Sequence, residues 1–379
     1  MIKGIYIANH NYQDKSSGVT KKIDMQLKAF NHAGMSIDKC ILFSDTVIDK
    51  AIRRLPFVPA YFDIEITKLC SNIIRQQYDF VYIRYSFSTR YFIDFIRKIS
   101  KSGATIIIEF PTFPYDRNSD QLSWKLELAK DKHYRNKLFL YTDIGVDYSE
   151  YDRIFNIPCI KISNGISPDS YIIHKTNLFR QKKTERITFI GVALLAKWNG
   201  YDRLIKSISA YNKTHDCILF FNIVGEGNEY SALKQMVSRT NTEQYVKFYG
   251  YLSGDDLYKV YDDSDIGVGS LSPSRKYKNH IMSSLKTKEY TAIGIPFIKG
   301  DQDKAFTPET ADFYYDVPDN EEDLNMEKIV EWYTKLLENY GDDLSIHIHS
   351  YAERYLSWEK QLIPVFDYIS NTVRGKLYE

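Results

Sequence analysis

The sequence has 379 residues, 44% of them hydrophobic and 26% charged, with 50 basic side chains against 49 acidic ones. This length predicts two domains, and this composition excludes a disordered chain and a general nucleic-acid-binding surface. The charge is uneven along the chain, because residues 1–170 hold 24 basic and 19 acidic side chains and the remainder is acidic overall.

Short β-branched segments alternate with amphipathic segments along the first half, which is typical of βαβ units. The predicted helices are Gly18–Ala33, Asp63–Gln77 and Arg90–Ser102. The predicted strands are Ile2–Ala8, Ile37–Phe43, Phe80–Arg84, Thr105–Phe110, Leu138–Thr142 and Cys159–Ile162. They predict a first domain over residues 1–165, followed by a turn-rich and basic linker over 166–186.

The same alternation returns in the second half. The predicted strands are Ile187–Ile190, Ile218–Val224, Val246–Tyr249, Ile266–Val268 and Pro296–Ile298. The predicted helices are Arg203–Thr214, Tyr230–Arg239, Asp255–Tyr261, Leu285–Ile293 and Trp358–Ser370. The fold class is therefore α/β, with a second parallel-sheet domain over 187–355 and a final helical segment over 356–379.

Four cysteines are far apart in the chain and form no C-x-x-C pair. This spacing argues against a zinc site or a disulfide framework and favours a reducing cytoplasm. No segment approaches the ~18 apolar residues of a membrane span, and the first strand does not read as a signal peptide. Asp263 and Asp265 could bind a metal as a D-x-D pair, although a turn is the more ordinary role, so no metal site is expected.

A basic stretch precedes and enters the helix at Leu285. Five cations and no acidic residue occur between 271 and 288: Arg275, Lys276, Lys278, Lys286 and Lys288. A loop that carries such charge into a helix N-terminus suits a diphosphate, but it also fits a solvated basic face. Glu289 could accept both hydroxyl groups of a ribose, or it could pair with a neighbouring lysine.

Two glycine-containing turns and one carboxylate are further candidates. Gly18 opens a helix after the first strand, where a ligand could approach closely or where the helix simply begins. Val224-Gly-Glu-Gly227 is an incomplete dinucleotide motif or a tight turn. Glu109 ends a predicted strand beside several aromatic residues, and it is a candidate catalytic or acceptor-side residue or a local hydrogen-bonding group.

In their order and spacing, these pieces resemble the retaining glycosyltransferases of the GT-B fold, family 4 type, over almost the whole chain. The motifs that carry the resemblance are Ser17-Gly-Val-Thr-Lys-Lys22, Ser163-Asn-Gly-Ile-Ser167, Phe189-Ile-Gly191, Val224-Gly-Glu-Gly227 and Lys288-Glu-Tyr-Thr-Ala-Ile-Gly-Ile-Pro296. The resemblance implies two Rossmann-like domains facing a cleft, with the C-terminal helix crossing back to the first domain.

The resemblance also implies which residues bind the donor. Glu289 would hold the ribose, Tyr251 and Leu252 the base, and Gly18 the diphosphate. Ile281 stands where the family often has a glutamate that contacts the donor sugar. Val192 and Asn199 stand where it usually has an arginine and a lysine that bind phosphate. Lys197, Lys286 and Lys288 are the candidate replacements for these two cations, chosen by charge and location rather than by motif. The implied donor-binding set is Gly18, Lys197, Asn199, Tyr251, Leu252, Lys286, Thr287, Lys288 and Glu289.

The expected activity is transfer of a hexose from a nucleotide diphosphate sugar, with UDP favoured, to a glycan, lipid-linked or surface-polysaccharide hydroxyl, with retention. The nucleotide sugar is then a substrate and no cofactor is expected. The expected location is the cytoplasm, with peripheral contact at the inner face of a membrane. A sugar-nucleotide epimerase, a two-lobed sugar-binding protein and a metal-dependent transferase remain as alternatives.

Overall fold

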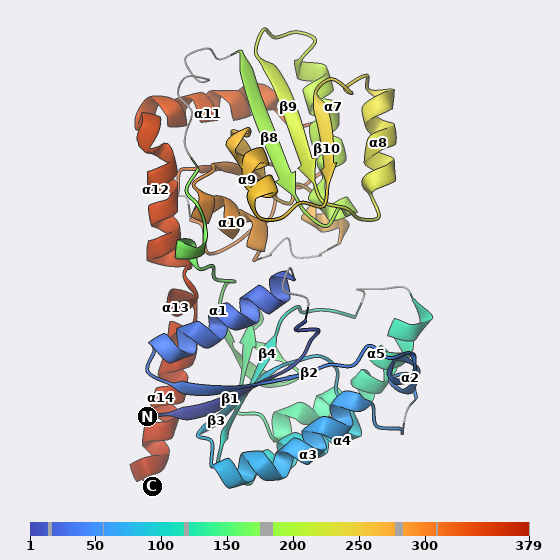
Figure 1. Cartoon of the computed structure of the whole chain (residues 1–379), viewed down its shortest axis with the longest axis vertical. Coiled ribbons are helices and arrows are strands. Elements are labelled where there is room, and N and C mark those ends of the chain that lie inside the picture. The colour runs from blue at the N-terminus through green and yellow to red at the C-terminus, as the bar shows by residue number, and fades with distance from the viewer. Residues whose placement is uncertain are drawn as a thin grey trace. The chain divides into compact units, whose positions relative to one another are not determined.

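The computed structural model describes residues 1–13, 17–55, 57–116, 121–174, 185–276, 283–307 and 310–378. The chain divides into two compact units. Unit 1 is Met1–Ile162 together with Trp358–Glu379, and unit 2 is Ser163–Ser357. Each unit is a twisted sheet covered by helices (Figure 1).

Unit 1 contains a seven-stranded sheet in the order β2-β1-β3-β4-β5-β7-β6, in which only the β6–β7 pair is antiparallel. Its strands are β1 (Lys3–Asn9), β2 (Ser36–Leu42), β3 (Phe80–Arg84), β4 (Thr105–Phe110), β5 (Ile144–Asp147), β6 (Arg153–Ile154) and β7 (Ile157–Lys161). Its helices are α1 (Gly18–His32), α2 (Val47–Ile52), α3 (Tyr61–Gln76), α4 (Arg90–Ser100), α5 (Leu122–Tyr134), α13 (Trp358–Gln361) and α14 (Ile363–Tyr378).

The strand predicted over Leu138–Thr142 is wrong. A 3₁₀ turn over Arg135–Leu140 occupies most of that segment, and the strand β5 follows at Ile144–Asp147. Gly145 lowers the β propensity of the true strand. The glycine is required there, because a Cβ atom would lie 2.7 Å from the Cys159 sulfur.

Unit 2 contains a six-stranded, fully parallel sheet in the order β10-β9-β8-β11-β12-β13. Its strands are β8 (Arg186–Val192), β9 (Ile218–Val224), β10 (Val246–Gly250), β11 (Ile266–Val268), β12 (Phe297–Lys299) and β13 (Tyr314–Asp316). Its helices are α7 (Tyr201–Tyr211), α8 (Tyr230–Arg239), α9 (Asp255–Asp262), α10 (Leu285–Ile293), α11 (Met326–Tyr340) and α12 (Leu344–Tyr351). None of the described helices is long and apolar enough to cross a membrane.

The segment predicted as a linker over 166–186 is in part a fixed portion of unit 2. The Ile166 amide donates to the Leu356 carbonyl at 2.8 Å, and the His174 amide donates to the Ile293 carbonyl at 2.7 Å. Residues 175–184 of the predicted linker lie outside the described residues. The described part therefore packs on the second sheet domain instead of running free between domains.

The C-terminal segment returns to unit 1, as expected from the resemblance. Trp358 is buried in the same apolar cluster as Phe30 of α1, and the Phe30 and Phe366 rings meet edge to face with centroids 5.1 Å apart. The chain therefore completes the first core only with its last two helices.

Glu109, at the end of β4, forms the centre of a buried charge cluster in unit 1. One carboxylate oxygen accepts from Arg84 and pairs with the Lys22 ammonium at 3.2 Å. The other accepts from the Tyr82 hydroxyl at 2.8 Å and from the Gln26 amide at 2.9 Å. Burial opposes ionisation, but the two cations and these donors together lower the pKa of Glu109 to about 2.

Lys22 links this cluster to the returning C-terminal segment. Its ammonium lies 3.7 Å from the centroid of the Tyr148 ring and 5.3 Å from that of Trp358. Burial lowers the pKa of Lys22 to about 7, against the opposing effect of Glu109. The cluster holds two buried cations for one carboxylate, so it depends on Glu109 staying ionised.

We expect Glu109→Gln to lower the free energy of unfolding by about 3–5 kcal/mol, because it leaves Lys22 and Arg84 without a counter-charge. The difference from the parent should shrink as the pH falls from 4.5, the ordinary pKa of a glutamate, toward 2, where Glu109 itself becomes protonated. It should also shrink as the pH rises toward 7, where Lys22 loses its proton and no longer needs a counter-charge. Urea unfolding at several pH values measures it.

The control is Glu65→Gln, which removes an exposed pairing with Lys68 and should change the free energy of unfolding by about 0–1 kcal/mol. Equal effects of the two substitutions would contradict the role assigned to the cluster.

Candidate functional site

The N-terminus of α10 lies at the centre of the candidate site in unit 2. Its N-cap residue Ser284 forms no side-chain cap, and the first turn contains no acidic residue. Asn164 holds the chain just before the helix, donating from its backbone amide and its side-chain amide to Ser283, each at 2.7 Å. A helix start with uncapped N–H groups and no local acid favours an anion.

Lys286 and Asn199 are brought together at this helix start. The Lys286 ammonium donates to the Asn199 side-chain oxygen at 2.9 Å, and the Asn199 amide donates to the Leu194 carbonyl at 2.9 Å. Desolvation lowers the pKa of Lys286 to about 8, while Asp301 acts in the opposite direction. Lys286 therefore offers a cation to the loop that follows β8.

The side chains of Thr287 and Lys288 are turned into the core, which corrects the expectation that these side chains contact the donor. Both residues are fully buried. The Thr287 hydroxyl donates to the Ser284 carbonyl at 3.0 Å, and the Lys288 ammonium pairs with Asp303. Burial lowers the pKa of Lys288. The charge of Lys288 is thus compensated inside the unit and is not available to a ligand.

Glu289 lies on the half-buried side of α10. Its carboxylate accepts from the Tyr171 hydroxyl at 3.3 Å, and Tyr171 follows the short 3₁₀ turn Pro168–Ser170. Burial, together with the charge of Glu289, raises the pKa of Tyr171. Glu289 therefore presents a carboxylate one helical turn from Lys286, and its expected contact with a ribose stays a prediction.

Tyr251 and Leu252 follow β10, as expected. Tyr251 is 60% exposed, whereas Leu252 packs against the apolar core of unit 2. The adjoining Val224-Gly-Glu-Gly227 turn behaves as a tight turn, because a Cβ atom on Gly225 would lie 1.9 Å from the Ala193 carbonyl oxygen. Contact of Tyr251 and Leu252 with a base stays a prediction.

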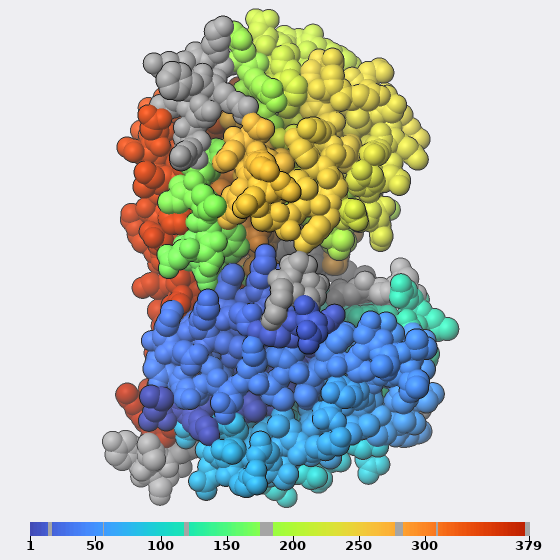
Figure 2. Space-filling view, viewed as in Figure 1, coloured from blue at the N-terminus to red at the C-terminus, as the bar shows by residue number. Residues whose placement is uncertain are grey.

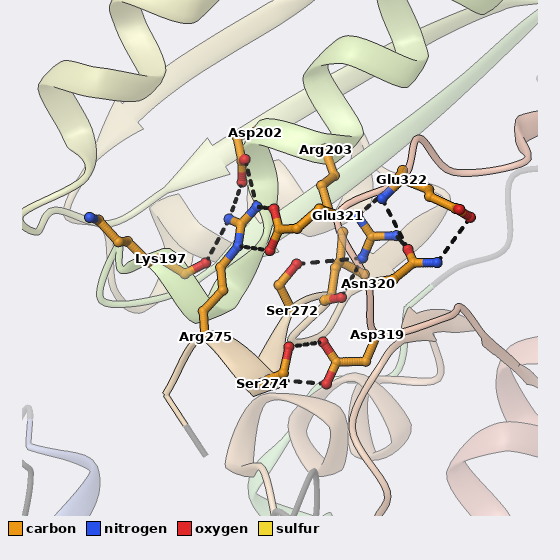
Figure 3. A network of polar contacts seen from close by, with 11 residues as sticks. Lys197, Asp202, Arg203, Ser272, Ser274, Arg275, Asp319, Asn320, Glu321 and Glu322 are labelled. Carbon is orange, nitrogen blue, oxygen red and sulfur yellow. Dashed lines mark hydrogen bonds and ion pairs between the residues drawn. The ribbon is translucent and has the colours of Figure 1, made fainter. Parts of the chain in front are cut away.

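Lys197 has different surroundings from Lys286. Its side chain is exposed and lines a cavity of about 260 Å³ with Glu229 and Met236 of the α8 region. Figure 3 shows this side chain extending away from the neighbouring polar network, while its carbonyl oxygen accepts from Arg275 at 3.0 Å. The expected contact of Lys197 with a phosphate group stays a prediction.

Arg275 is part of a structural network and is not a free cation (Figure 3). Its guanidinium donates to both oxygens of Asp202, at 2.7 and 2.9 Å, and to both oxygens of Glu321, at 2.9 and 2.5 Å. These hydrogen bonds raise its pKa. Lys276 lies over the Trp198 ring at 4.1 Å, and Lys278 and Ile281 lie outside the described residues.

Arg203 is a positioning residue that the sequence did not reveal. It is 2% exposed and donates to the Leu271 carbonyl at 2.6 Å, to the Glu322 carbonyl at 2.8 Å and to the Asn320 side chain at 3.0 Å (Figure 3). It joins the loops after β11 and β13 to α7. A basic residue in an amphipathic helix usually faces solvent, so no sequence signal marks it.

The remaining candidates have separate positions. Gly18 is the exposed first residue of α1, whose N-cap Ser17 forms no side-chain cap, and its contact with a diphosphate stays a prediction. Glu109 is fully buried within its cluster, which corrects its expected contact with an acceptor. The Asp265 carboxylate accepts from the backbone amide of Thr188 at 2.7 Å, which fits a structural role rather than metal binding. The described residues contain no group of three or more side chains suited to a metal ion.

Comparisons with known proteins agree with this architecture. Residues 174–302 match the family model described as "Glycosyl transferases group 1". A glycosyltransferase from Rickettsia africae is 13% identical, with 99% of both chains covered and a TM-score of 0.63. No curated protein matches the sequence.

Two further solved structures share the fold. HepE from Anabaena, in complex with UDP, is 11% identical over 99% of this chain and 100% of its own, with a TM-score of 0.59. The lipopolysaccharide outer core galactosyltransferase WaaB is 12% identical over 99% and 100%, with a TM-score of 0.57. The two parallel-sheet units have the GT-B fold, and with the family-model match over the helix that carries Lys286 and Glu289, the protein is a glycosyltransferase.

Proposed function

We propose that the protein transfers a hexose from a nucleotide diphosphate sugar, with UDP as the favoured nucleotide, to a hydroxyl group of a glycan or polysaccharide precursor, with retention. The observation that carries the proposal is the pairing of the uncapped α10 N-terminus with Lys286, inside the matched segment. HepE, which shares the fold, was crystallised with UDP. That likeness favours a uridine nucleotide here.

The proposed role of this end of α10 is to stabilise the leaving diphosphate. When the bond between the sugar and the diphosphate breaks, negative charge builds up on the phosphate oxygens. Lys286 and the first N–H groups of α10 are fixed donors for that charge, and such preorganised groups lower a transition-state barrier. The proposal needs no metal ion and no covalent nucleophile.

The proposed donor contacts extend from this end of the helix. Glu289 would accept the ribose hydroxyls, since a half-buried carboxylate forms strong hydrogen bonds to neutral donors. Tyr251 and Leu252 would bind the base. For Gly18 in unit 1, the proposed role is to leave its helix start open to a phosphate group. Lys197 and Asn199 would complete the set, Asn199 by holding Lys286 in place.

The acceptor side of the proposal is a lipid-linked or surface glycan, met at the inner face of a membrane. WaaB, which shares the fold, acts on the lipopolysaccharide outer core. All four cysteines are free thiols, which favours a reducing compartment such as the cytoplasm.

We expect Lys286→Gln to lower kcat/KM for the donor by roughly 100-fold, the effect of losing one preorganised donor to the leaving group. UDP affinity of the parent should fall as the pH rises through about 8, where Lys286 loses its proton, and Lys286→Arg should remove that dependence. Calorimetric UDP titrations and transfer assays from pH 6.5 to 9.5 measure both effects.

Lys206→Gln is the matched control, because Lys206 is exposed on α7. Its kinetics should equal those of the parent. A Lys286→Gln enzyme with parental turnover would refute the leaving-group role, and inhibition of the parent by EDTA would refute the metal-free proposal.

We expect Glu289→Ala to weaken UDP binding by roughly 10–100-fold, since a hydrogen bond to a charged group contributes about 1.5–3 kcal/mol. The parent should bind UDP more tightly than 2′,3′-dideoxy-UDP, and the variant should not distinguish them. Tyr171→Phe removes only the tyrosine hydroxyl and should retain the discrimination. If Glu289→Ala still discriminates, the ribose assignment fails.

A further inference from the structure

Unit 1 displays a concentrated group of exposed apolar side chains. The most exposed are Val47 at 83%, Phe57 at 79%, Leu122 at 73% and Ile48 at 72%. Of the twenty large apolar side chains that are exposed among the described residues, seven fall within two short segments, 47–58 and 122–126. The seven, called here the α2–α5 surface, are Val47, Ile48, Leu55, Phe57, Val58, Leu122 and Leu126.

Polar contacts hold the two chain segments of this surface together. The Lys130 ammonium of α5 donates to the Leu55 carbonyl at 3.3 Å, and Glu127 of α5 faces Arg53 and Arg54. Figure 1 shows α2 beside α5 at one end of unit 1, and Figure 2 shows the blue atoms of this part of unit 1 at the molecular surface. The apolar side chains are therefore displayed by a fixed scaffold.

Asp49 fixes the base of this scaffold. It is 5% exposed, pairs with Arg53 at 2.7 Å and accepts from the Tyr61 amide at 2.6 Å. It thereby ties α2 to the start of α3. The buried acid anchors the segment, and the apolar side chains of Val47 and Ile48 on the same short helix remain exposed.

Cations outnumber acids around the apolar side chains. The acids around the surface are Asp45, Asp49, Asp63 and Glu127. Asp49 and Asp63 are buried, and Asp45 pairs with Lys50 at 2.6 Å. The cations are Lys50, Arg53, Arg54, Lys125 and Lys130, joined by the exposed Arg90 at the start of α4. Arg90 and Lys130 line one small cavity with Phe57, Val58 and the buried acid Asp63, so two cations lie directly beside the apolar groups.

We propose that the α2–α5 surface docks on an anionic lipid bilayer. Apolar side chains enter the boundary between headgroups and acyl chains, and the surrounding cations meet the lipid phosphates. This inference rests on the proposed function, because docking would bring the enzyme to the bilayer that holds a lipid-linked acceptor. A second copy of the chain suits the surface less well, because a two-fold contact would place these cations against one another.

The test uses the full chain and vesicles of phosphatidylcholine with 30% phosphatidylglycerol, compared with phosphatidylcholine alone, in co-sedimentation at 50 and 500 mM NaCl. We expect binding to the anionic vesicles that weakens roughly tenfold in high salt, as an electrostatic contribution requires. The double variant Ile48→Ser with Phe57→Ser and the variant Arg54→Glu should each weaken binding by roughly tenfold or more.

Ile346→Ser is the matched control, because Ile346 is 56% exposed on α12 of unit 2, and it should bind vesicles as the parent does. Thermal unfolding checks that each variant is folded. Absence of parental binding to anionic vesicles, or equal binding by parent and double variant, would overturn the inference. A parental dimer that the double variant dissociates would overturn it in favour of a second copy.

UDP affinity separates this inference from the proposed function. The docking variants should bind UDP as the parent does, because none of the altered residues lies in unit 2. A parent that binds vesicles but no nucleotide would retain the docking surface and refute the donor assignment.

Discussion

The guanidinium of Arg275 is the interaction on which the geometry of the donor side depends. It binds Asp202 at the start of α7 and Glu321 after β13 at the same time, and it also holds the Lys197 carbonyl. Arg203 joins the same loops by donating to the backbone carbonyls of Leu271 and Glu322. The segments that follow β8, β11 and β13 at the carboxyl edge of the sheet are thereby fixed to one another. The segment after β8 carries Asn199, which contacts Lys286 of α10. Ligands of such sheets bind at this edge.

The basic residues near α10 differ in function because their partners differ. Arg275 and Lys288 have carboxylate partners inside the unit, whereas the Lys286 ammonium is held by a neutral amide. Asp301 acts on Lys286 through its charge, but the hydrogen bond that positions the ammonium is to a neutral group, which leaves its charge for a ligand. A count of charges along the chain cannot separate these cases, since Asp202 is 73 residues away from Arg275.

Much of the fold followed from the sequence, because buried strands of a parallel sheet are continuous apolar segments. The bounds predicted for β3, β4 and β9 coincide with the structure, whereas β5 was missed because Gly145 and a neighbouring apolar 3₁₀ turn reverse the local signal. The position of the donor-side helix was predicted as well. The burial of the Lys288 side chain was not predicted. Most residues of this helix are buried, so helical spacing does not reveal which side chains face the core and which face the ligand.

The return of the chain at Trp358 has a consequence for biosynthesis. Unit 2 is one continuous segment of sequence, so all of its contacts can form once Ser357 has left the ribosome. Unit 1 begins the chain, yet Lys22 and the apolar face of α1 contact Trp358, which is encoded more than three hundred codons later. These contacts cannot form until the end of the chain has been synthesised. The domain translated first is therefore the one completed last, which reverses the usual N-to-C order of folding during translation.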